Sequence, residues 1–550
     1  MKILLLISSF NSLSQRVFCE LKEFNYEVRI CLSSQENLIE EIKEFNPSLI
    51  FCPFLKEYLK EDITSNYPTF ILHPGIIGDR GHQSLDHAIN DEKKQWGVVI
   101  LKANEELDAG DIYASSNFFM RDTSKASIYR NEVCDATSKA LKELLINLKN
   151  REFKPIPQIK NEIHPRLTQE NRKIEWEKDT SQEIIKKINM SDSYPGVKEE
   201  FFGITCFLYG VHKESSFRGK PKEIIAKRDG AICVGTIDGA IWISHLKEEN
   251  RFKLPATYVL KEKLKGVKEQ RIPLILENKE ETFYEIYVKR EDEIAYLYFN
   301  FHNGAMNSEQ AIRLKYAIDF LKENCKVLVL CGGEEFFSNG IHLNILEDSK
   351  KQGEDGWSNI NAMNDVVKSI LFAEDIITVA SFSKNSGAGG VFLGLSCDYT
   401  IAKEGVVFNP HYKTMGLTGS EYHTYTFYKR VEKSIADEIL TKTIPIGSKR
   451  AKEIGMLDEV YKEEEYEQNL KKFCQALIED EDSFETFIEE KSDFLFENEA
   501  KIELCKENEL KIMYPEFWDK SSIFHKLRNE FIYKKEHKES LERLKELSNA

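Results

Sequence analysis

The sequence predicts a multidomain α/β protein, and three observations support this. The chain of 550 residues is too long for one hydrophobic core. Strand-like apolar runs alternate with amphipathic helical segments in its N-terminal and C-terminal parts. A Pro-rich connection at 151–167 and a charged segment at 260–282 enclose a stretch of short strand-like runs. We therefore expect a mostly parallel sheet domain at 1–155, a small β-rich domain at 160–265, and an α/β domain with a helical C-terminal tail at 285–550.

The first domain is predicted from five strand-like runs and four helical segments. The strand-like runs are KILLLI, YEVRICL, PSLIFCPF, PTFILH and WGVVILK. The helical segments are residues 12–24, 36–45, 84–92 and 124–150. Ligands of such sheets bind beyond the carboxyl ends of the strands. The segment ILHPGIIGDRGHQSLDHAI at 71–89 follows such an end and is therefore a candidate site.

The next two parts differ in their pattern. After the connection, a helix at 181–190 precedes strand-like runs at 201–213, 230–247 and 280–290, separated by Gly and Asp turns. From about residue 290 the alternation returns, with the strands IAYLYFNF, CKVLVLCGG and DIITVASFS and helices at 308–324 and 362–374. The C-terminal segment is helical in pattern, charged and rich in Phe, which predicts the tail.

Composition excludes several classes of function. A net charge of −16 argues against general nucleic-acid binding, which needs a basic surface. No apolar run reaches the roughly 20 residues that span a membrane, and MKILLLISSF reads as a buried strand rather than a secretory signal. The 11 cysteines form neither a CxxC pair nor a metal-ligand spacing. We expect a cytoplasmic protein with reduced thiols that binds small molecules and no metal, nucleic acid or membrane.

His73 and Asp108 are the first candidate catalytic pair. His73 ends the run PTFILH, and Asp108 lies in LDAGDIY after the next strand-like run. A His and an Asp at neighbouring strand ends can move protons while an amine leaves an acyl carbon. Such a pair is often incidental. His82 and His87 could instead join His73 around a metal, but no acidic or thiol partner is spaced to complete that set.

The pattern strand–HPG–x5–RG–helix, followed by strand–LDAGD, resembles the folate-dependent formyltransferases. The resemblance implies that His73 and Asp108 are catalytic and that 10-formyltetrahydrofolate is the cosubstrate. The Asn of the family's Asn-x-His motif falls on Ile71, which cannot hydrogen-bond a formyl oxygen, so the acceptor need not be a free amine. The candidate cofactor-binding residues here are Arg80, Gln83 and Ser84.

Two further features accompany this resemblance. Gln83 and Ser84 are expected to begin the following helix, with Ser84 as its cap. The segment PRLTQENRKIEWEKDTSQEIIKKINMSDSYPGV resembles the C-terminal domain of methionyl-tRNA formyltransferases. The likeness to formyltransferases therefore covers roughly residues 1–265.

Two Gly-bearing turns mark a second candidate site. EEFFSNGIHL, Glu334–Leu343, follows one strand, and SKNSGAGGVFLGLSCDYTIA, Ser383–Ala402, follows another. Two such turns at adjacent strand ends can aim two backbone N–H groups at one point and form an oxyanion hole. One Gly-rich turn often only lets elements pack closely, but two turns with CDY closing the helix are more specific.

This half resembles the crotonase superfamily. The resemblance implies that the N–H groups of Ile341 and Gly389 are the oxyanion donors, with Gly390 beside them at the cofactor. The two catalytic glutamates of enoyl-CoA hydratases map to Phe392 and Tyr412. Because neither is a carboxylate, we expect no hydration of enoyl thioesters.

Other groups near these positions can still move a proton on a small acyl thioester. They lie in NPHYKTMGL and GSEYHTY and are Tyr412, Glu421 and Tyr422. Phe392 is expected to line the pocket and to leave room for a one-carbon group.

The joined halves resemble, nearly end to end, the hydrogenase maturation factors called HypX or HoxX. The resemblance implies transfer of formyl from 10-formyltetrahydrofolate to coenzyme A (CoA), then decarbonylation of formyl-CoA to carbon monoxide (CO) and CoA. The CO becomes a ligand of the iron in NiFe hydrogenase. The hydrogenase large-subunit precursor and other maturation proteins are candidate partners.

Some assignments remain open. Arg130 and Lys384 are candidate partners of the CoA phosphates. The chain could instead be a formyltransferase for an amine or a nucleotide sugar, with the crotonase half structural, or a non-catalytic scaffold that delivers a ligand. Ile71 weighs against the first alternative, and the register of His73 and Asp108 weighs against the second. We expect one CoA to serve both reactions, because released formyl-CoA would be hydrolysed.

Overall fold

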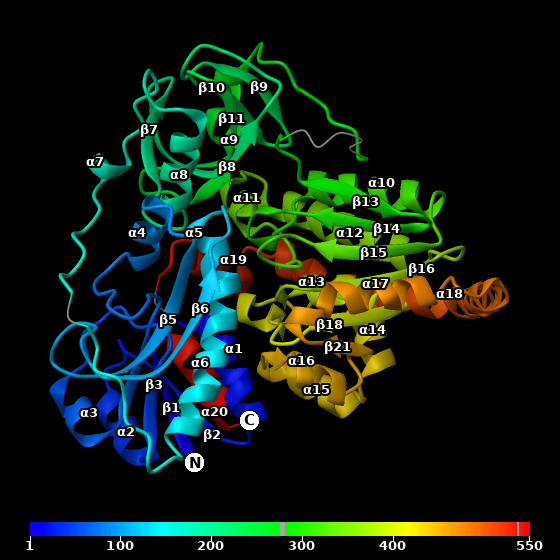
Figure 1. Cartoon of the computed structure of the whole chain (residues 1–550). Helices are drawn as coiled ribbons and strands as arrows, with labels where there is room; N and C mark the ends of the chain where they lie inside the picture. The colour runs from blue at the N-terminus through cyan, green and yellow to red at the C-terminus, as the bar shows by residue number, and fades with distance from the viewer. Residues whose placement is uncertain (160, 276–280, 536–537, 550) are drawn as a thin grey trace. The chain divides into compact units, whose positions relative to one another are not determined.

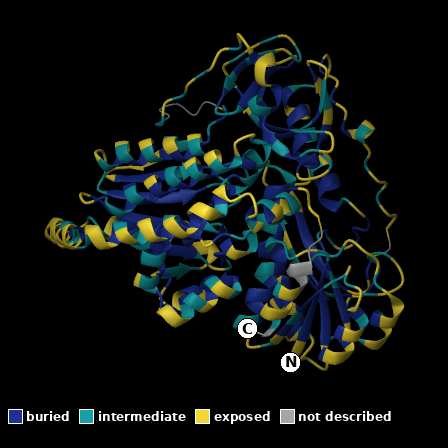
Figure 2. Cartoon of the chain, turned by 180° about the vertical axis from the view of Figure 1, so that it is seen from behind, coloured by how far each residue is buried: buried dark blue, intermediate teal, exposed yellow. Residues whose placement is uncertain are grey.

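The computed structural model describes residues 1–549 except 160, 276–280 and 536–537, and it divides into two compact units (Figure 1). The first unit comprises the described parts of Met1–Arg271, Lys279–Phe283 and Lys538–Ala550. The second comprises those of Ile272–Asn278 and Tyr284–His537. Strands form the buried interior of both units, with exposed residues concentrated on helices and loops (Figure 2). The predicted α/β class is confirmed.

The N-terminal part of the first unit is a six-stranded sheet. Its strands are β1 (Lys2–Ile7), β2 (Glu27–Leu32), β3 (Leu49–Cys52), β4 (Thr69–His73), β5 (Gln95–Lys102) and β6 (Ile112–Phe119). Their order is β2-β1-β3-β4-β5-β6. The first four are parallel, whereas β5 runs antiparallel to β4 and β6 antiparallel to β5. The apolar run that forms β1 is buried along nearly its whole length, as expected for a central parallel strand.

The helices of this domain follow the predicted alternation. They are α1 (Ser12–Glu23), α2 (Leu38–Phe45), α3 (Glu61–Asn66), α4 (Ser84–Asn90), α5 (Lys125–Ile128) and α6 (Cys134–Asn147). A π-helical turn, η1 (Tyr129–Val133), joins α5 to α6, so the helix predicted at 124–150 forms with this interruption. Asn11 caps α1 by accepting a hydrogen bond from the Ser14 N–H.

The β-rich part of the first unit is antiparallel. Its strands are β7 (Val197–Phe201), β8 (Ile204–Glu214), β9 (Ile224–Arg228), β10 (Ala231–Gly235), β11 (Ala240–Glu248) and β12 (Lys253–Pro255). They lie in the order β7-β8-β11-β10-β9, with β12 paired to β11. The helices are α7 (Gln169–Arg172), α8 (Ser181–Ser191), α9 (Ala256–Leu260) and the 3-10 turn η2 (Lys261–Leu264). The ring of Trp242 is buried in its core, with Nε1 donating to Glu214.

The second unit contains a six-stranded, mostly parallel sheet. Its strands are β13 (Ile286–Glu291), β14 (Ile294–Phe299), β15 (Val327–Gly332), β16 (Ile377–Phe382), β18 (Tyr399–Lys403) and β21 (Glu459–Tyr461), in that order. Only the edge pair β13–β14 is antiparallel. A small sheet pairs β17 (Ser386–Gly387), β19 (Val407–Asn409) and β20 (Ile446–Gly447).

The run predicted as a strand at 280–290 ends in the second unit, although we grouped it with the strand-like runs of the β-rich domain. The second unit begins again at Tyr284, within the predicted run, and β13 pairs with β14 there. Its apolar residues alternate along a hairpin, which is a local pairing that the short sequence separation of the two strands favours. Residue 280 itself lies outside the described part of the chain.

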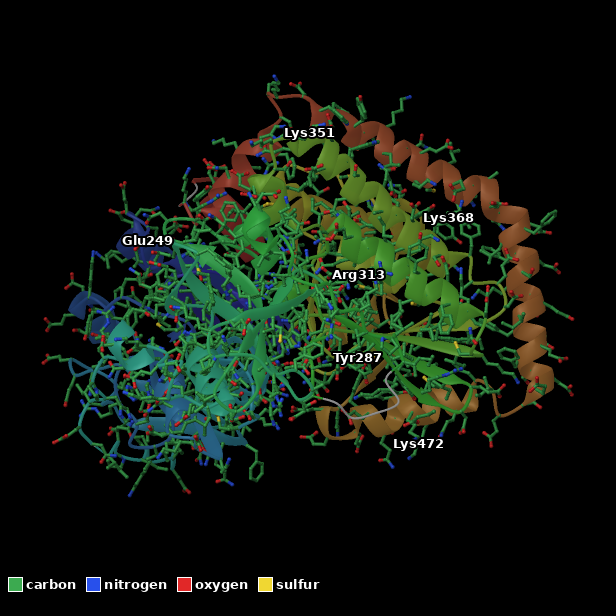
Figure 3. The ribbon with its side chains drawn as sticks, turned by 90° about the horizontal axis from the view of Figure 1, so that it is seen from above. Glu249, Tyr287, Arg313, Lys351, Lys368 and Lys472 are labelled. Atoms are coloured by element: carbon green, nitrogen blue, oxygen red, sulfur yellow. The ribbon has the colours of Figure 1, made fainter. Side chains whose placement is uncertain are left out.

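Helices cover both faces of this sheet. They are α10 (Ser308–Lys322), α11 (Leu343–Asp348), α12 (Gln352–Leu371), α13 (Gly389–Leu395), α14 (His423–Arg430), α15 (Lys433–Lys442), α16 (Ser448–Glu453), α17 (Tyr466–Ala476), α18 (Glu481–Trp518) and α19 (Ile523–Ile532), with the 3-10 turns η3 (His302–Gly304), η4 (Tyr412–Met415) and η5 (Glu463–Glu465). Charged side chains such as Lys351 and Lys472 project from the outer surface (Figure 3).

The long helix α18 buries only a narrow stripe. Leu495, Ile502 and Glu509 recur every seven residues on its buried face. The helix is charged over the rest of its surface. This explains why the sequence of the tail is polar although the helix packs on the core of the second unit.

The last helix departs from the prediction that the tail through residue 550 belongs with the C-terminal domain. α20 (Lys538–Asn549) belongs to the first unit and lies beside β2 (Figure 1). Ser548 Oγ accepts a hydrogen bond from the Ile30 N–H at 3.0 Å, and Lys545 pairs with Glu41 at 2.6 Å. β2 is an edge strand with unpaired backbone groups, and α20 satisfies one of them.

Candidate active sites

His73 is the buried last residue of β4 and the centre of a cluster of proton carriers. Its side chain is 5% exposed. Nε2 lies 2.7 Å from Asp79 Oδ2, and Nδ1 lies 3.5 Å from Asp108 Oδ2. The structure thus brings together the two residues that the sequence pairs and adds a second carboxylate.

Asp108 reaches His73 by an unexpected route. We expected both residues at the carboxyl ends of neighbouring strands, but β5 is antiparallel to β4, so its carboxyl end lies at the opposite edge of the sheet. The loop 103–111 carries Asp108 back to His73. Asp108 has a φ of 50°, and its Oδ2 accepts a hydrogen bond from the Gly81 N–H at 3.1 Å. The loop, and not the end of the strand, therefore positions this carboxylate.

The sequence pattern does not single out Asp79, which appears there only as part of the DRG turn. In the structure its side chain is buried, and three donors surround it. Besides His73, the Ser84 hydroxyl donates to Oδ2 at 2.6 Å and His164 Nε2 lies 2.9 Å from Oδ1. Burial opposes ionisation of Asp79, but the hydrogen bonds from His73 and Ser84 outweigh it and lower the pKa of this carboxyl. The sequence feature that could have pointed to Asp79 is an acidic residue six positions after His73 in a Gly-rich turn.

The polar groups of Gln83 and Ser84 form hydrogen bonds with other residues of the protein. The Gln83 amide oxygen accepts from the Leu167 N–H at 2.7 Å. The prediction that Ser84 caps the helix is wrong. Gln83 occupies the N-cap position with a φ of 65°, and the Ser84 hydroxyl lies 2.8 Å from the Pro74 carbonyl as well as beside Asp79.

Arg80 also points into the protein. Its guanidinium donates to the Leu107 carbonyl at 3.0 and 3.2 Å, to Glu106 at 2.7 Å and to the Asn161 carbonyl at 3.2 Å. The side chain is 5% exposed. Arg80 therefore holds the loop of Asp108 in place by bonds to its backbone.

The structure also describes three further predicted positions. Ile71 is half-buried in β4 and packs against an apolar cluster. Arg130 lies in η1 near Asp192; burial lowers the pKa of this guanidinium, while the Asp192 charge opposes that shift. Lys384 follows β16 in the second unit.

In the second unit, the turns before α11 and α13 nearly touch. The Met306 N–H donates to the Gly340 carbonyl at 2.8 Å and the His342 N–H donates to the Met306 carbonyl at 3.0 Å, so the Ile341 N–H faces away from this bridge. A Cβ added at Gly340 would lie 3.2 Å from the Gly389 nitrogen. Neither the Ile341 nor the Gly389 N–H donates a hydrogen bond to another described residue. The two predicted oxyanion donors thus come from adjacent turns.

Tyr412 and Glu421 form a buried pair beside these turns. The Tyr412 hydroxyl donates to Glu421 Oε2 at 2.6 Å. A Cβ added at Gly389 would collide with the Glu421 carboxylate, so this carboxylate lies against the turn that carries the Gly389 N–H. Burial raises the pKa of Glu421 to about 7, and burial together with the Glu421 charge raises that of Tyr412 well above its usual value. Tyr412 is therefore a neutral donor, and Glu421 changes charge near neutral pH.

Phe392 and Gly390 complete the surroundings of this pair. The Phe392 ring stacks on Tyr412 with centroids 5.5 Å apart and also packs on Phe427. A Cβ at Gly390 would collide with the Ser338 carbonyl, so a glycine is needed for α13 to approach the first turn. Phe392 fills space beside the pair, and Gly390 acts through backbone packing.

The structure does not bring Tyr422 into this cluster. Its hydroxyl donates to Glu503 of α18 at 2.8 Å. The next residue, His423, contacts the site instead, since its ring packs on Phe392 and Tyr412. His423 Nδ1 lies 3.3 Å from Glu509, a buried carboxylate of α18. No sequence signal points to Glu509, because it lies 85 residues from its Thr424 partner in an ordinary helical pattern.

His342 caps α11 from the turn that carries Ile341. Its Nδ1 accepts a hydrogen bond from the Ile345 N–H at 3.3 Å, and its side chain is buried. Burial lowers the pKa of His342 from 6.5 to about 4. The ring is therefore neutral in the folded protein at neutral pH.

The lowered pKa of His342 predicts that acid reduces the stability of the folded protein. Below pH 6.5 the unfolded chain binds a proton at His342, whereas the folded chain does not until the pH approaches 4. The free energy of unfolding therefore falls as the pH drops from 6.5 to 4. At pH 5 we expect a loss of about 2 kcal/mol relative to pH 7. In His342→Asn, which keeps an acceptor without titrating, this part of the pH dependence should vanish. Urea unfolding of both proteins at pH 7 and pH 5 measures it, and identical pH dependence in the two would contradict the assignment.

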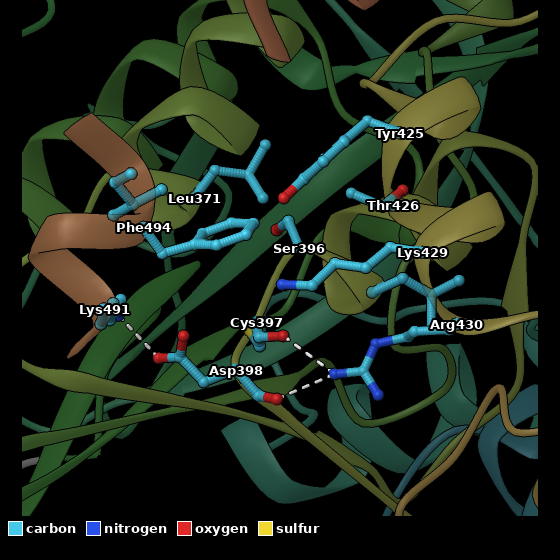
Figure 4. Close-up of a pocket in the computed structure, with 12 residues that line it drawn as sticks. Leu371, Ser396, Cys397, Asp398, Tyr425, Thr426, Lys429, Arg430, Lys491 and Phe494 are labelled. Carbon is cyan, nitrogen blue, oxygen red and sulfur yellow. Dashed lines mark hydrogen bonds and ion pairs between the residues drawn. The ribbon is translucent and has the colours of Figure 1, made fainter. Parts of the chain in front are cut away.

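A pocket open to solvent lies at the far end of α13 from Gly389 (Figure 4). The space there, which includes open solvent, is about 440 Å³, and its lining includes Asp398, Tyr425, Lys429, Lys491 and Phe494. Lys491 pairs with Asp398 at 2.7 Å, which links α18 to the sheet. None of the predicted site residues lines this pocket.

Two negative findings apply to the described residues. No helix there is both long and apolar enough to cross a membrane. Nor does any group of three or more His, Cys, Asp or Glu side chains in that part of the chain have a geometry that could hold a metal ion.

Three family profiles match the chain. Formyl transferase matches residues 20–145, the formyl transferase C-terminal domain matches 166–264, and enoyl-CoA hydratase/isomerase matches 290–517.

Individual proteins resemble the chain over different lengths. The hydrogenase maturation factor HoxX of Bradyrhizobium diazoefficiens is 32% identical over 546 residues, with 97% of this chain and 95% of that protein covered. A methionyl-tRNA formyltransferase of Pseudothermotoga lettingae is 27% identical over 201 residues, covering 36% of this chain and 66% of that protein. The crystal structure of HypX from Aquifex aeolicus in complex with tetrahydrofolic acid superposes with a TM-score of 0.95 at 42% identity, covering 98% of this chain and 97% of that one.

Proposed function

Because the chain belongs to the HypX/HoxX family of hydrogenase maturation factors, we propose that it makes carbon monoxide for a hydrogenase iron in two steps. In the first step, a formyl group passes from 10-formyltetrahydrofolate to the thiol of CoA. In the second step, formyl-CoA loses CO and regenerates CoA. The folate part of this proposal draws on the formyl transferase match and on the tetrahydrofolic acid bound by the Aquifex relative.

The first step belongs to the His73 cluster. The CoA sulfur attacks the formyl carbon, the bond from that carbon to N10 of the folate breaks, and the thiol proton ends on N10. His73 and Asp108 are the groups that can carry this proton. Ile71 removes the amide that would polarise the formyl oxygen, and a thiolate, as a strong nucleophile, needs less carbonyl activation than an amine does. This supports CoA over an amine or nucleotide sugar as the acceptor.

The second step belongs to the Tyr412–Glu421 pair. Glu421 takes the formyl proton, the carbon–sulfur bond breaks, CO leaves, and the proton passes to the thiolate. The Ile341 and Gly389 N–H groups, directed at the formyl oxygen, would draw electron density from the carbon and make its proton more acidic. The pKa of Glu421 near 7 suits a base that takes up and returns a proton at neutral pH.

The observation that carries this proposal is the replacement of the hydratase carboxylates by Phe392 and Tyr412, with one new buried carboxylate at Glu421. A single base that returns its proton to sulfur is sufficient for decarbonylation, whereas hydration uses two carboxylates on water. A buried, ionisable carboxylate is costly to retain, which weighs against a purely scaffolding role.

The test follows carbon through both steps. Purified protein with 10-formyltetrahydrofolate and a small amount of CoA should yield tetrahydrofolate and CO in equal amounts, with many CO molecules per CoA because CoA is regenerated. A reduced haem protein traps the CO and reports it by absorbance, and omission of CoA is the control. Consumption of formyl-tetrahydrofolate without CO, or CoA consumed once per formyl group, would contradict the second step.

A further inference from the structure

Each nitrogen of the His73 ring, in the first unit, faces a carboxylate. Nε2 is within hydrogen-bond distance of Asp79, at 2.7 Å, whereas Nδ1 is 3.5 Å from Asp108. The two carboxylates therefore hold the ring unequally. A hydrogen bond at one ring nitrogen decides which tautomer a neutral imidazole adopts.

The surroundings of Asp79 hold its carboxylate in one place and keep it ionised. Its side chain is 2% exposed, and three donors from separate segments hold its two oxygens: His73 on β4, Ser84 on α4 and His164 on the Pro-rich connection. His164 is itself held, since its backbone N–H donates to the Arg80 carbonyl and its ring stacks on His87 with centroids 4.5 Å apart. A charged carboxylate only accepts hydrogen bonds, so the Nε2 that faces it must carry a proton.

We propose that Asp79 is a positioning residue that keeps His73 in the Nε2–H tautomer, so that Nδ1 is the atom that moves the proton in formyl transfer. Asp108, 3.5 Å from Nδ1 and anchored by the Gly81 N–H, is then the partner on the reacting side. This inference rests on the proposed formyl transfer.

The step balances with this assignment. The thiol proton of CoA passes to Nδ1 as sulfur bonds to the formyl carbon. The same proton passes from Nδ1 to N10 as the carbon–nitrogen bond breaks. His73 ends neutral, and Asp79 keeps its charge and stabilises the imidazolium that exists between the two transfers.

Asp79→Asn tests the role, because the amide keeps the size of the side chain but no longer specifies the tautomer. We expect kcat for formyl-tetrahydrofolate consumption with CoA to fall about 10²–10⁴-fold, while KM for the folate is unchanged. Asp91→Asn, the same exchange on the exposed end of α4, should leave both kcat and KM unchanged.

A second measurement does not depend on the variant folding. In the wild-type protein labelled with 15N in its histidine rings, the signals of His73 are those absent from His73→Gln. They should report a proton on Nε2 and a lone pair on Nδ1. The opposite tautomer, or an Asp79→Asn protein with wild-type kcat, would overturn the inference. A wild-type protein that does not consume formyl-tetrahydrofolate with CoA would instead refute the proposed function.

Discussion

Replacing Glu421 by Gln is expected to stop CO release while formyl transfer to CoA continues. The amide side chain keeps the size of the native one but cannot take the formyl proton, and loss of a general base typically costs about 10²–10⁴ in rate. Formyl-CoA, or the formate that its hydrolysis yields, should then accumulate in step with tetrahydrofolate. CO trapped by a haem protein and formate measured in the same reaction give both rates.

Tyr412→Phe should also stop CO release, for a different reason. It leaves the carboxylate in place but removes the hydroxyl that donates to Glu421 at 2.6 Å. Tyr428→Phe, whose hydroxyl pairs with Asp437 on a neighbouring helix, is the matched control and should release CO normally. Unchanged CO yield from Tyr412→Phe would remove Tyr412 from the mechanism, and unchanged yield from Glu421→Gln would remove the proposed base.

Replacing His73 by Ala is expected to abolish the first step and to spare the second. Without the imidazole, the thiol proton has no carrier to N10, so consumption of formyl-tetrahydrofolate should fall by about 10²–10⁴. CO release from synthetic formyl-CoA should continue at the wild-type rate, because the Tyr412–Glu421 pair is intact. Tetrahydrofolate formation and CO trapping, each started from its own substrate, measure the two steps.

The control for this variant is His82→Ala, which removes an exposed imidazole from the same loop. It should retain both activities. Full consumption of formyl-tetrahydrofolate by His73→Ala would contradict the assignment of the first site, whereas loss of both steps would show that the two sites depend on one another.

Local sequence patterns were sufficient to predict most elements and to bring forward both candidate sites. Apolar runs such as KILLLI became buried strands, and the Gly-bearing turns at Ile341 and Gly389 came together because they follow strands that are neighbours in one parallel sheet. These features depend on local periodicity and on strand order, which short stretches of sequence encode. The sequence likewise indicated that Phe392 and Tyr412 stand where hydratases have carboxylates, since this depends only on the residue type at a motif position.

Contacts between distant segments became visible only in the folded chain. There β5 runs antiparallel, so that a loop brings Asp108 to His73, and α20 covers the edge of β2. Asp79 lies between two imidazoles, and the Tyr422 hydroxyl turns toward Glu503. In each case chain folding brings the partners together. Their separation in the sequence does not match the repeat of a helix or a strand. Which carboxylate faces which proton carrier therefore follows from packing and burial, which a local sequence pattern does not contain.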